Sequence, residues 1–177
     1  IGVRTIFNML GPLTNPARAQ NQVMGVFDPI WIEPVLNVLQ NMGSQHVLVL
    51  ASEDGLDEIS ISAPTDIGEL KEGQLLRYKV TPEDFGMTRR SDFSMLKVNS
   101  AQESLVLVRD ALTYKNEAAG DIVALNAGAA IYAANLCAEL AEGVKKAQEI
   151  LRSGAALTKL EQLAAFTQSL PSEGNKA

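Results

Sequence analysis

Hydrophobic residues in the first 50 positions alternate between strand and helix patterns. Residues 21–27 are rich in Val, Met and Phe and predict a short strand, which Asp28-Pro29 closes with a turn or helix-start signal. Between residues 32 and 42 the apolar positions recur every three or four residues, which predicts a helix. Residues 46–50 form a continuous apolar run, typical of a strand buried on both faces. This order predicts a crossover unit with parallel strand pairing.

A hairpin pattern follows. Residues 66–70 and 74–80 predict two short strands, and Lys71-Glu72-Gly73 supplies the turn between them. Thr81 then opens a Thr-Pro-Glu-Asp sequence that predicts a brief helical turn, which Gly86 ends. The hairpin makes the expected sheet mixed. The predicted fold class is therefore α/β, with a mixed, largely parallel sheet flanked by helices.

The second half of the chain has helical periodicity. Ser100 stands three residues before Glu103, which is the spacing of a helix-capping box. An alanine-rich stretch contains Gly128, which permits close backbone approach to a neighbouring element. We expect residues 1–170 to form one α/β domain and residues 171–177 to be a polar tail. The predicted helices span residues 100–114, 121–140, 141–152 and 157–168.

Composition narrows the function classes. The 177 residues are 46% hydrophobic and carry a formal net charge of -6, which disfavours binding to nucleic acid phosphates or anionic membranes. Cys137 is the single cysteine, which excludes an internal disulfide and suits a reducing, cytoplasmic compartment. No stretch reaches the roughly 18 apolar residues that a transmembrane helix needs. We therefore expect a soluble protein.

The acidic segment 53–58 is the first candidate for chemistry. It follows the predicted buried strand, at the edge where open α/β sheets usually bind ligands. Asp57 and Glu58 offer adjacent carboxylates, which are oxygen ligands suited to magnesium. From the residues alone, an acidic surface loop is the favoured alternative, because charged residues are mostly solvated.

Three further features have structural interpretations on sequence grounds. The segment 11–16, Gly-Pro-Leu-Thr-Asn-Pro, predicts a loop of fixed shape that steers the chain. His46, the only histidine, opens an apolar strand, where a structural role is favoured over acid-base catalysis. Cys137 has no histidine near it in sequence and is expected to be a small buried hydrophobe within a helix.

Two motifs carry a family resemblance. Residues 2–16, Gly-Val-Arg-Thr-Ile-Phe-Asn-Met-Leu-Gly-Pro-Leu-Thr-Asn-Pro, resemble the signature segment of anthranilate phosphoribosyltransferases. Residues 54–60, Asp-Gly-Leu-Asp-Glu-Ile-Ser, resemble the magnesium motif of the same family. The Thr-Pro-Glu-Asp-Phe-Gly stretch from Thr81, Leu125-Asn-Ala and the Leu-Arg-Ser-Gly ending at Gly154 are also similar to that family. The likeness therefore covers nearly the whole chain.

This resemblance implies a fold, a reaction and a set of site residues. The implied fold is the phosphoribosyl-binding domain of the nucleoside phosphorylase and anthranilate phosphoribosyltransferase type. The implied reaction transfers the phosphoribosyl group of phosphoribosyl pyrophosphate to anthranilate, releasing pyrophosphate, in tryptophan biosynthesis. By resemblance, Asp57 and Glu58 would bind Mg²⁺, while Gly11 and Pro12 would line the anthranilate site.

The resemblance also implies what the chain lacks. It identifies the chain as the carboxy-terminal portion of such an enzyme, so that the glycine-rich pyrophosphate loop, a Lys-His-Gly-Asn segment and an anthranilate-binding arginine would lie upstream. The full-length protein would be a homodimer through its helical amino-terminal domain, and the chain alone is expected to be inactive. Arg4 would be structural or would support the residues that contact the substrate. Ala51-Ser52 departs from the His-containing pair of many members, which concerns substrate contacts and not the metal.

Two rival functions share the expected architecture. A non-enzymatic relative that binds nucleic acid should be basic along its binding groove, which the net charge of -6 disfavours. A pyrimidine nucleoside phosphorylase would cleave a similar glycosidic bond with phosphate. The pairing of segment 11–16 with segment 54–58 favours the anthranilate enzyme over this second rival.

Overall fold

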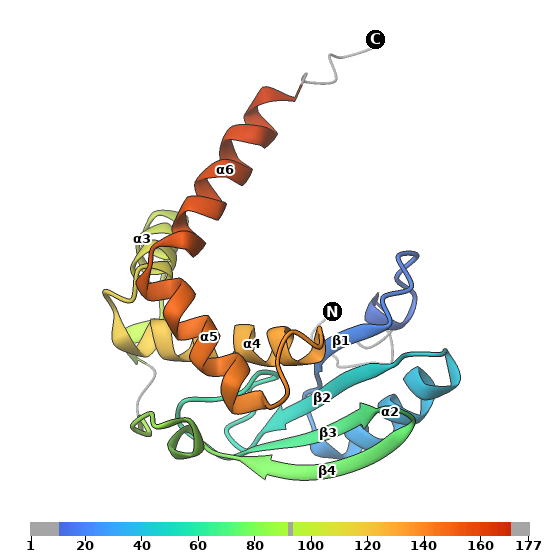
Figure 1. The fold of residues 1–177 in the computed structure, drawn as a ribbon. Helices are drawn as coiled ribbons and strands as arrows, with labels where there is room; N and C mark the ends of the chain where they lie inside the picture. Colours follow the sequence, from blue (N-terminus) through green and yellow to red (C-terminus); the bar gives the residue numbers. More distant parts are fainter. Residues whose placement is uncertain (1–10, 92–93, 171–177) are drawn as a thin grey trace.

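A four-stranded sheet forms the centre of the protein. The computed structural model describes residues 11–91 and 94–170, and Figure 1 shows how their helices and strands are arranged. The strand order is β1-β2-β3-β4, in which β1 pairs parallel to β2 and the other two pairings are antiparallel. The mixed α/β fold is thus confirmed, although the described part of the sheet is less parallel than expected because hairpin-like connections join its last three strands. The strands are β1 (Asn21–Gly25), β2 (His46–Ser52), β3 (Thr65–Lys71) and β4 (Gln74–Val80).

One helix, α2 (Ile32–Asn41), covers one face of the sheet. Its buried positions follow the helical spacing seen in the sequence, and they pack with Met24, Val47 and Val49 from the strands. The short 3-10 helix η1 (Pro29–Trp31) leads into it, and the Asp28 side chain accepts a hydrogen bond from the Ile30 amide there. The predicted strand–helix–strand unit is therefore confirmed.

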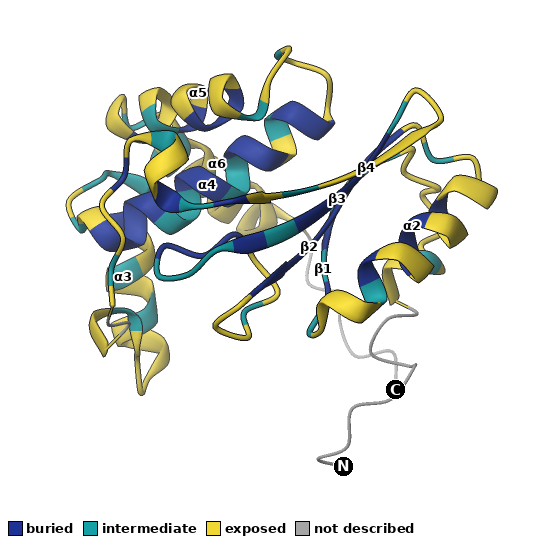
Figure 2. Ribbon diagram, turned by 90° about the horizontal axis from the view of Figure 1, so that it is seen from below, coloured by how far each residue is buried: buried dark blue, intermediate teal, exposed yellow. Residues whose placement is uncertain are grey.

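The remaining helices lie on the opposite face (Figures 1 and 2). Among them α4 packs closest to the sheet and α5 packs on α4, whereas α6 has no buried residue and extends away from the body. None of the helices in the described part of the chain combines the length and apolar character needed to cross a membrane. The helices opposite α2 are α3 (Ala101–Leu112), α4 (Glu117–Ala133), α5 (Leu140–Arg152) and α6 (Ala155–Ser169). The short 3-10 helices η2 (Pro82–Phe85) and η3 (Ser94–Leu96) precede them in the chain.

Strand β2 joins the two halves of the core. All seven of its residues are buried, as its continuous apolar run predicted. Leu48 and Leu50 face the cluster under α4, and Val47 and Val49 face the cluster under α2. This alternation follows from the two-residue period of a strand.

The alanine-rich helix differs from its prediction in both bounds. Residues 121–140 were expected to be helical, but α4 begins at Glu117 because the Asn116 side chain caps it by accepting a hydrogen bond from the Ala119 amide. The helix ends at Ala133, so Cys137 lies half-buried in the connection to α5 and not within a helix. Its thiol donates to the Glu139 carbonyl.

Two smaller expectations have mixed outcomes. Ser100 does cap α3, because its hydroxyl accepts from the Glu103 amide. The segment 11–16 is not entirely loop, since residues 11–13 are helical and the turn follows them. The predicted tail 171–177 and the structural assignment of Arg4 lie outside the described residues.

Helices α4 and α5 approach each other at Gly128. A Cβ atom at this position would lie 2.5 Å from both the backbone nitrogen and the Cα of Val144 on α5. Real side chains do not tolerate such contacts with backbone, so only glycine allows this separation of the two helices. The close approach that the sequence suggested at Gly128 is confirmed.

We expect Gly128→Leu to separate α4 from α5 and to lower the free energy of unfolding by about 3 kcal/mol, as overpacking of a dense core does. The measurement is chemical denaturation of the full-length protein followed by circular dichroism. Ala130→Leu, on the exposed side of the same helix, is the matched control and should change stability by less than about 0.5 kcal/mol. Equal losses in both variants would contradict the close packing.

Candidate functional site

The acidic loop, residues 53–62, forms most of the connection from β2 to β3, at the carboxyl end of the parallel pair β1 and β2. Asp57 and Glu58 are exposed, whereas the residues directly after them, Ile59 and Ser60, are buried. The backbone of this loop is thus anchored in the core while its two adjacent carboxylates face solvent. This is the edge of an open sheet at which ligands commonly bind.

Asp54 organises the acidic loop from within. Its Oδ2 accepts hydrogen bonds from the hydroxyls of Ser60 and Ser62, each at 2.5 Å, and its Oδ1 accepts from the Leu56 amide at 3.2 Å. Burial opposes ionisation, but these hydrogen bonds outweigh it and hold the pKa of Asp54 below its ordinary value. Asp54 therefore acts as a structural carboxylate of the loop.

Asp57 and Glu58 are acids of the loop that have no oppositely charged partner among residues 11–91 and 94–170. Glu53 pairs with Lys79 at 2.5 Å, but neither Asp57 nor Glu58 forms an ion pair with any described residue. The pKa of Glu58 is raised, first by partial burial and then by the negative charge of Asp57. A cation at this pair would relieve that repulsion.

The number of donors favours a cation that keeps part of its hydration shell. Among residues 11–91 and 94–170, no group of three or more His, Cys, Asp or Glu side chains could enclose a metal ion. Asp57 and Glu58 would therefore supply only two carboxylates. Magnesium is commonly held by one or two carboxylates together with water and substrate phosphates, so the residues present fit this ion.

Gly25 positions Asp57 from the sheet side. It is the last residue of β1, and a Cβ atom there would lie 1.7 Å from the Asp57 backbone oxygen. The acidic loop can cross the end of β1 only because this position has no side chain. Sequence reasoning did not single out Gly25, although a glycine within a predicted strand is a signal for close backbone approach.

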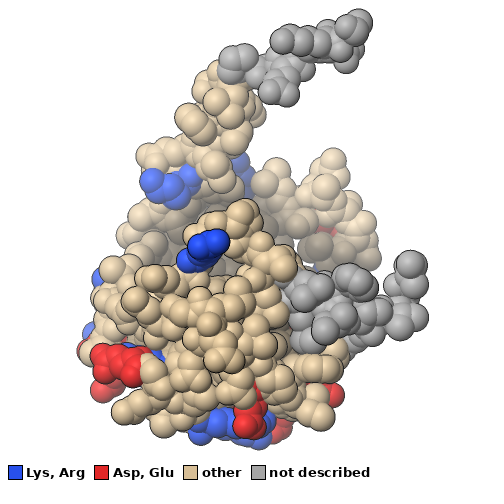
Figure 3. All heavy atoms as spheres, turned by 90° about the vertical axis from the view of Figure 1, so that its right-hand side faces the viewer, with Lys and Arg blue, Asp and Glu red and all other residues tan. Residues whose placement is uncertain are grey.

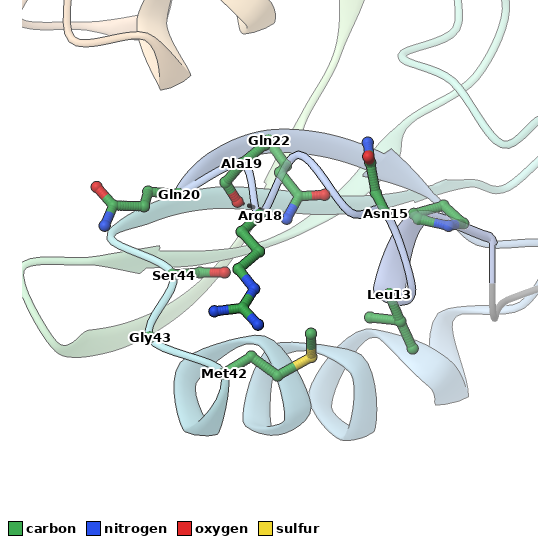
Figure 4. A pocket seen from close by; sticks show the side chains of 10 residues that line it. Leu13, Asn15, Arg18, Ala19, Gln20, Gln22, Met42, Gly43 and Ser44 are labelled. Atoms are coloured by element: carbon green, nitrogen blue, oxygen red, sulfur yellow. Dashed lines mark hydrogen bonds between the residues drawn. The ribbon is translucent and has the colours of Figure 1, made fainter.

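The second set of predicted site residues lies elsewhere. Pro12 lines a pocket of about 390 Å³ together with the apolar side chains of Leu13 and Met42, and Gly11 is exposed beside it. Arg18 and Gln22 add polar groups, and Figure 4 shows the Arg18 side chain extending toward the end of α2. An apolar wall with a guanidinium group is a suitable environment for an aromatic carboxylate.

The structure does not bring the two sets together. The pocket at Pro12 is built from residues near the amino end of β1 and the end of α2, while Asp57 and Glu58 follow the carboxyl end of β2. Because β1 and β2 are parallel, these positions lie at opposite edges of the sheet. The roles of Gly11 and Pro12 therefore stay predictions.

His46 lies far from the acidic loop, at the amino end of β2. It is 1% exposed, and its ring nitrogens contact Glu69 at 3.1 Å and Asn135 at 2.7 Å. Tyr78 and Tyr132 donate to the same Glu69 carboxylate at 3.0 and 2.7 Å. Burial, followed by the interaction with Glu69, raises the pKa of both tyrosines. A buried carboxylate with three partners stabilises the fold and supports the structural interpretation of His46.

The depressed pKa of Asp54 predicts a pH dependence. A carboxylate whose pKa is lower in the folded state stabilises above its unfolded value, ordinarily 3.8, and this contribution is lost as pH falls through the folded value. Asp54→Asn should therefore lower the melting temperature of the full-length protein at pH 7, and the difference from wild type should shrink below about pH 4. Differential scanning calorimetry of both proteins between about pH 3 and 7, a range that includes the ordinary pKa of an aspartate, measures this difference in melting temperature.

The control for this experiment is Glu33→Gln, which removes one exposed carboxylate from α2. We expect it to have little effect on the melting temperature. If the loss in Asp54→Asn stays constant as the pH falls, the carboxylate charge of Asp54 is not what orders the acidic loop.

The fold and the loop define a class of protein: a mixed α/β domain with a pair of carboxylates at its strand ends. Comparison with known proteins gives the family. Residues 1–157 match the family described as "Glycosyl transferase family, a/b domain". The match covers most of the chain, which therefore belongs to this family.

Individual relatives have one name in common. The anthranilate phosphoribosyltransferase of Thioalkalivibrio sulfidiphilus is 53% identical over 169 residues, which are 96% of this chain and 50% of that protein. The enzyme of the same name from Marinomonas sp. is 53% identical over 170 residues, 95% of this chain and 49% of that protein. The chain spans about half the length of the curated relatives it matches, and the resemblance noted in the sequence is confirmed.

Solved structures agree with these relatives. The crystal structure of anthranilate phosphoribosyltransferase from Thermus thermophilus is 40% identical, with a TM-score of 0.84 over 95% of this chain and 49% of that one. The Saccharomyces cerevisiae enzyme in complex with PRPP and Mg has a TM-score of 0.81 at 24% identity, over 96% of this chain and 49% of that one. At that identity the yeast structure supports the fold alone.

Proposed function

We propose that the protein containing this chain transfers the phosphoribosyl group of phosphoribosyl pyrophosphate to anthranilate, as the names of its relatives suggest. The observation that carries the proposal is the exposed pair Asp57 and Glu58, which form no ion pair with any described residue, at the strand ends of a domain with 53% identity to those relatives. In this reaction the anthranilate nitrogen forms a bond to ribose C1, the bond from C1 to the pyrophosphate oxygen breaks, and pyrophosphate leaves with the electron pair. The nitrogen then releases a proton to solvent.

Asp57 and Glu58 are the residues that would hold magnesium. Bound Mg²⁺ supplies charge neutralisation for the departing pyrophosphate, which becomes more negative as the ribose carbon becomes cationic. The two carboxylates would set the position of the ion, and the buried residues that follow them hold the backbone of the loop in place. No side chain of the acidic loop needs to act as an acid, because pyrophosphate leaves as a stable anion.

By the family resemblance, Gly11 and Pro12 are the proposed contacts for anthranilate, which requires that the full-length protein bring segment 11–16 close to the acidic loop. A proline ring presents a flat apolar surface, and glycine leaves the backbone open to a close approach by an aromatic ring. Such contacts orient the acceptor without taking part in bond formation. Residues elsewhere in the full-length protein would have to complete the site.

The charge distribution supports a small-molecule substrate over the nucleic-acid-binding alternative. Figure 3 shows one face of the protein on which Lys and Arg side chains lie in separate groups, with uncharged surface between them. A nucleic-acid groove requires basic residues clustered along one path. The formal charge of -6 adds to this argument.

Removing both carboxylates tests the proposed function. In the full-length protein, Asp57→Ala combined with Glu58→Ala should lower kcat/KM for phosphoribosyl pyrophosphate at least about 100-fold, which corresponds to ~3 kcal/mol of transition-state stabilisation. Consumption of anthranilate, followed by its fluorescence with Mg²⁺ present, is the measurement. Glu33→Ala, which removes an exposed acid from α2, is the control and should keep wild-type kinetics. Absence of turnover by the wild type would reject the proposed function.

Pro12 provides a separate test of acceptor binding. Pro12→Ala should raise KM for anthranilate about tenfold, because it removes apolar contact with the ring, and should leave KM for phosphoribosyl pyrophosphate unchanged. Pro16→Ala, an exposed position in the same segment, is the matched control for altered loop stiffness. Parallel changes in both KM values, or in both variants, would exclude a specific contact between Pro12 and anthranilate.

A further inference from the structure

A single side chain on α4 fixes the acidic loop at the residue that follows the carboxylate pair. Asn126 Oδ1 accepts a hydrogen bond from the Ile59 amide at 2.8 Å, and Asn126 Nδ2 donates to the Ile59 carbonyl at 3.0 Å. Both polar groups of one backbone residue are thus held by one amide, across a separation of 67 positions in the chain. Ile59 itself is 1% exposed, so its position follows that of α4.

The Asn126 side chain is held in this orientation by its own helix. Its Nδ2 also donates to the Ile122 carbonyl at 3.0 Å, which fixes the amide plane. The neighbouring residues Ala124 and Leu125 are fully buried against the sheet. A side chain with fixed rotamer on a buried helix is a rigid support for a functional loop.

Gly25 supports the loop from the other side. The Asp57 backbone oxygen lies where a Cβ atom at Gly25 would be, so the end of β1 limits movement of the loop toward the sheet. The two carboxylate-bearing residues therefore lie between a contact at Asp57 and a pair of hydrogen bonds at Ile59. Their side chains face solvent, but their backbone has little freedom.

We propose that Asn126 is a positioning residue that sets the backbone geometry of Asp57 and Glu58 for cation binding. The inference rests on the proposed function, since it requires that the carboxylate pair binds a divalent cation. Outer-shell groups that orient metal ligands typically contribute roughly 10- to 100-fold to metal affinity. A residue that only stabilises the fold would not change the affinity of the folded protein for the ion.

The test compares two asparagines of α4 in the full-length protein: Asn126 within the helix and Asn116 at its N-terminal cap. Asn126→Ala removes the support of the loop, and Asn116→Ala removes the cap of α4, a hydrogen bond of similar structural value that does not contact the loop. Binding of Mn²⁺ in the presence of inorganic pyrophosphate is followed by electron paramagnetic resonance of the free ion. We expect Asn126→Ala to weaken Mn²⁺ binding about tenfold or more and Asn116→Ala to leave it unchanged.

Amide hydrogen exchange provides a readout independent of the metal. Peptide-resolved exchange over residues 56–62 should lose protection at Ile59 in Asn126→Ala and keep it in Asn116→Ala. If Asn126→Ala proves too unstable to purify, Gly25→Ala displaces the same loop from the opposite side and should weaken Mn²⁺ binding in the same direction.

The outcomes separate the two proposals. Mn²⁺ binding that is insensitive to Asp57→Ala and Glu58→Ala would reject the metal site, and the role of Asn126 would fall with it. Binding that depends on those carboxylates but is equal in wild type and Asn126→Ala would overturn the positioning role alone. Unchanged protection at Ile59 in Asn126→Ala would overturn it as well, because the hydrogen bonds would not be holding the loop.

Discussion

Contact between α4 and the sheet is the interaction on which both the core and the acidic loop depend. The buried side of α4 packs against Leu48 and Leu50 of β2, and at Gly128 it also accommodates α5. From this fixed position, Asn126 reaches the backbone of Ile59. A change that shifts α4 would therefore move the loop as well as loosen the core, because both pack against the same helix.

The acidic loop shows how a protein can expose charge without losing backbone order. The Asp54 carboxylate accepts hydrogen bonds from hydroxyl and amide donors of its own loop, and Glu53 is neutralised by Lys79. Asp57 and Glu58, in contrast, form no ion pair with any described residue. Ordering costs conformational entropy, and the loop has met that cost before a ligand arrives. An ordered pair of exposed carboxylates is better suited to cation binding than an acidic surface loop that is only solvated.

The sequence was informative where local patterns decide structure. The apolar run at β2, the spacing within α2 and the Ser100 cap each depend on neighbouring residues, and each was predictable. The bounds of α4 were not, because alanine and glycine give a weak periodic signal and the cap at Asn116 lies before the alanine-rich run. Local propensity could not reveal that the helix ends at Ala133.

The candidate site divides along the same line. A motif made of consecutive residues placed Asp57 and Glu58 after a strand, but the supports of that motif come from far along the chain. Gly25 and Asn126 meet the loop only in the folded protein, and their sequence neighbours do not identify the loop as their partner. The separation between Pro12 and the carboxylates likewise follows from parallel pairing of β1 and β2, which puts the amino end of one strand far from the carboxyl end of the other. The candidate binding residues thus stand out in a sequence motif, whereas the residues that contact and support them are identified only in the folded structure.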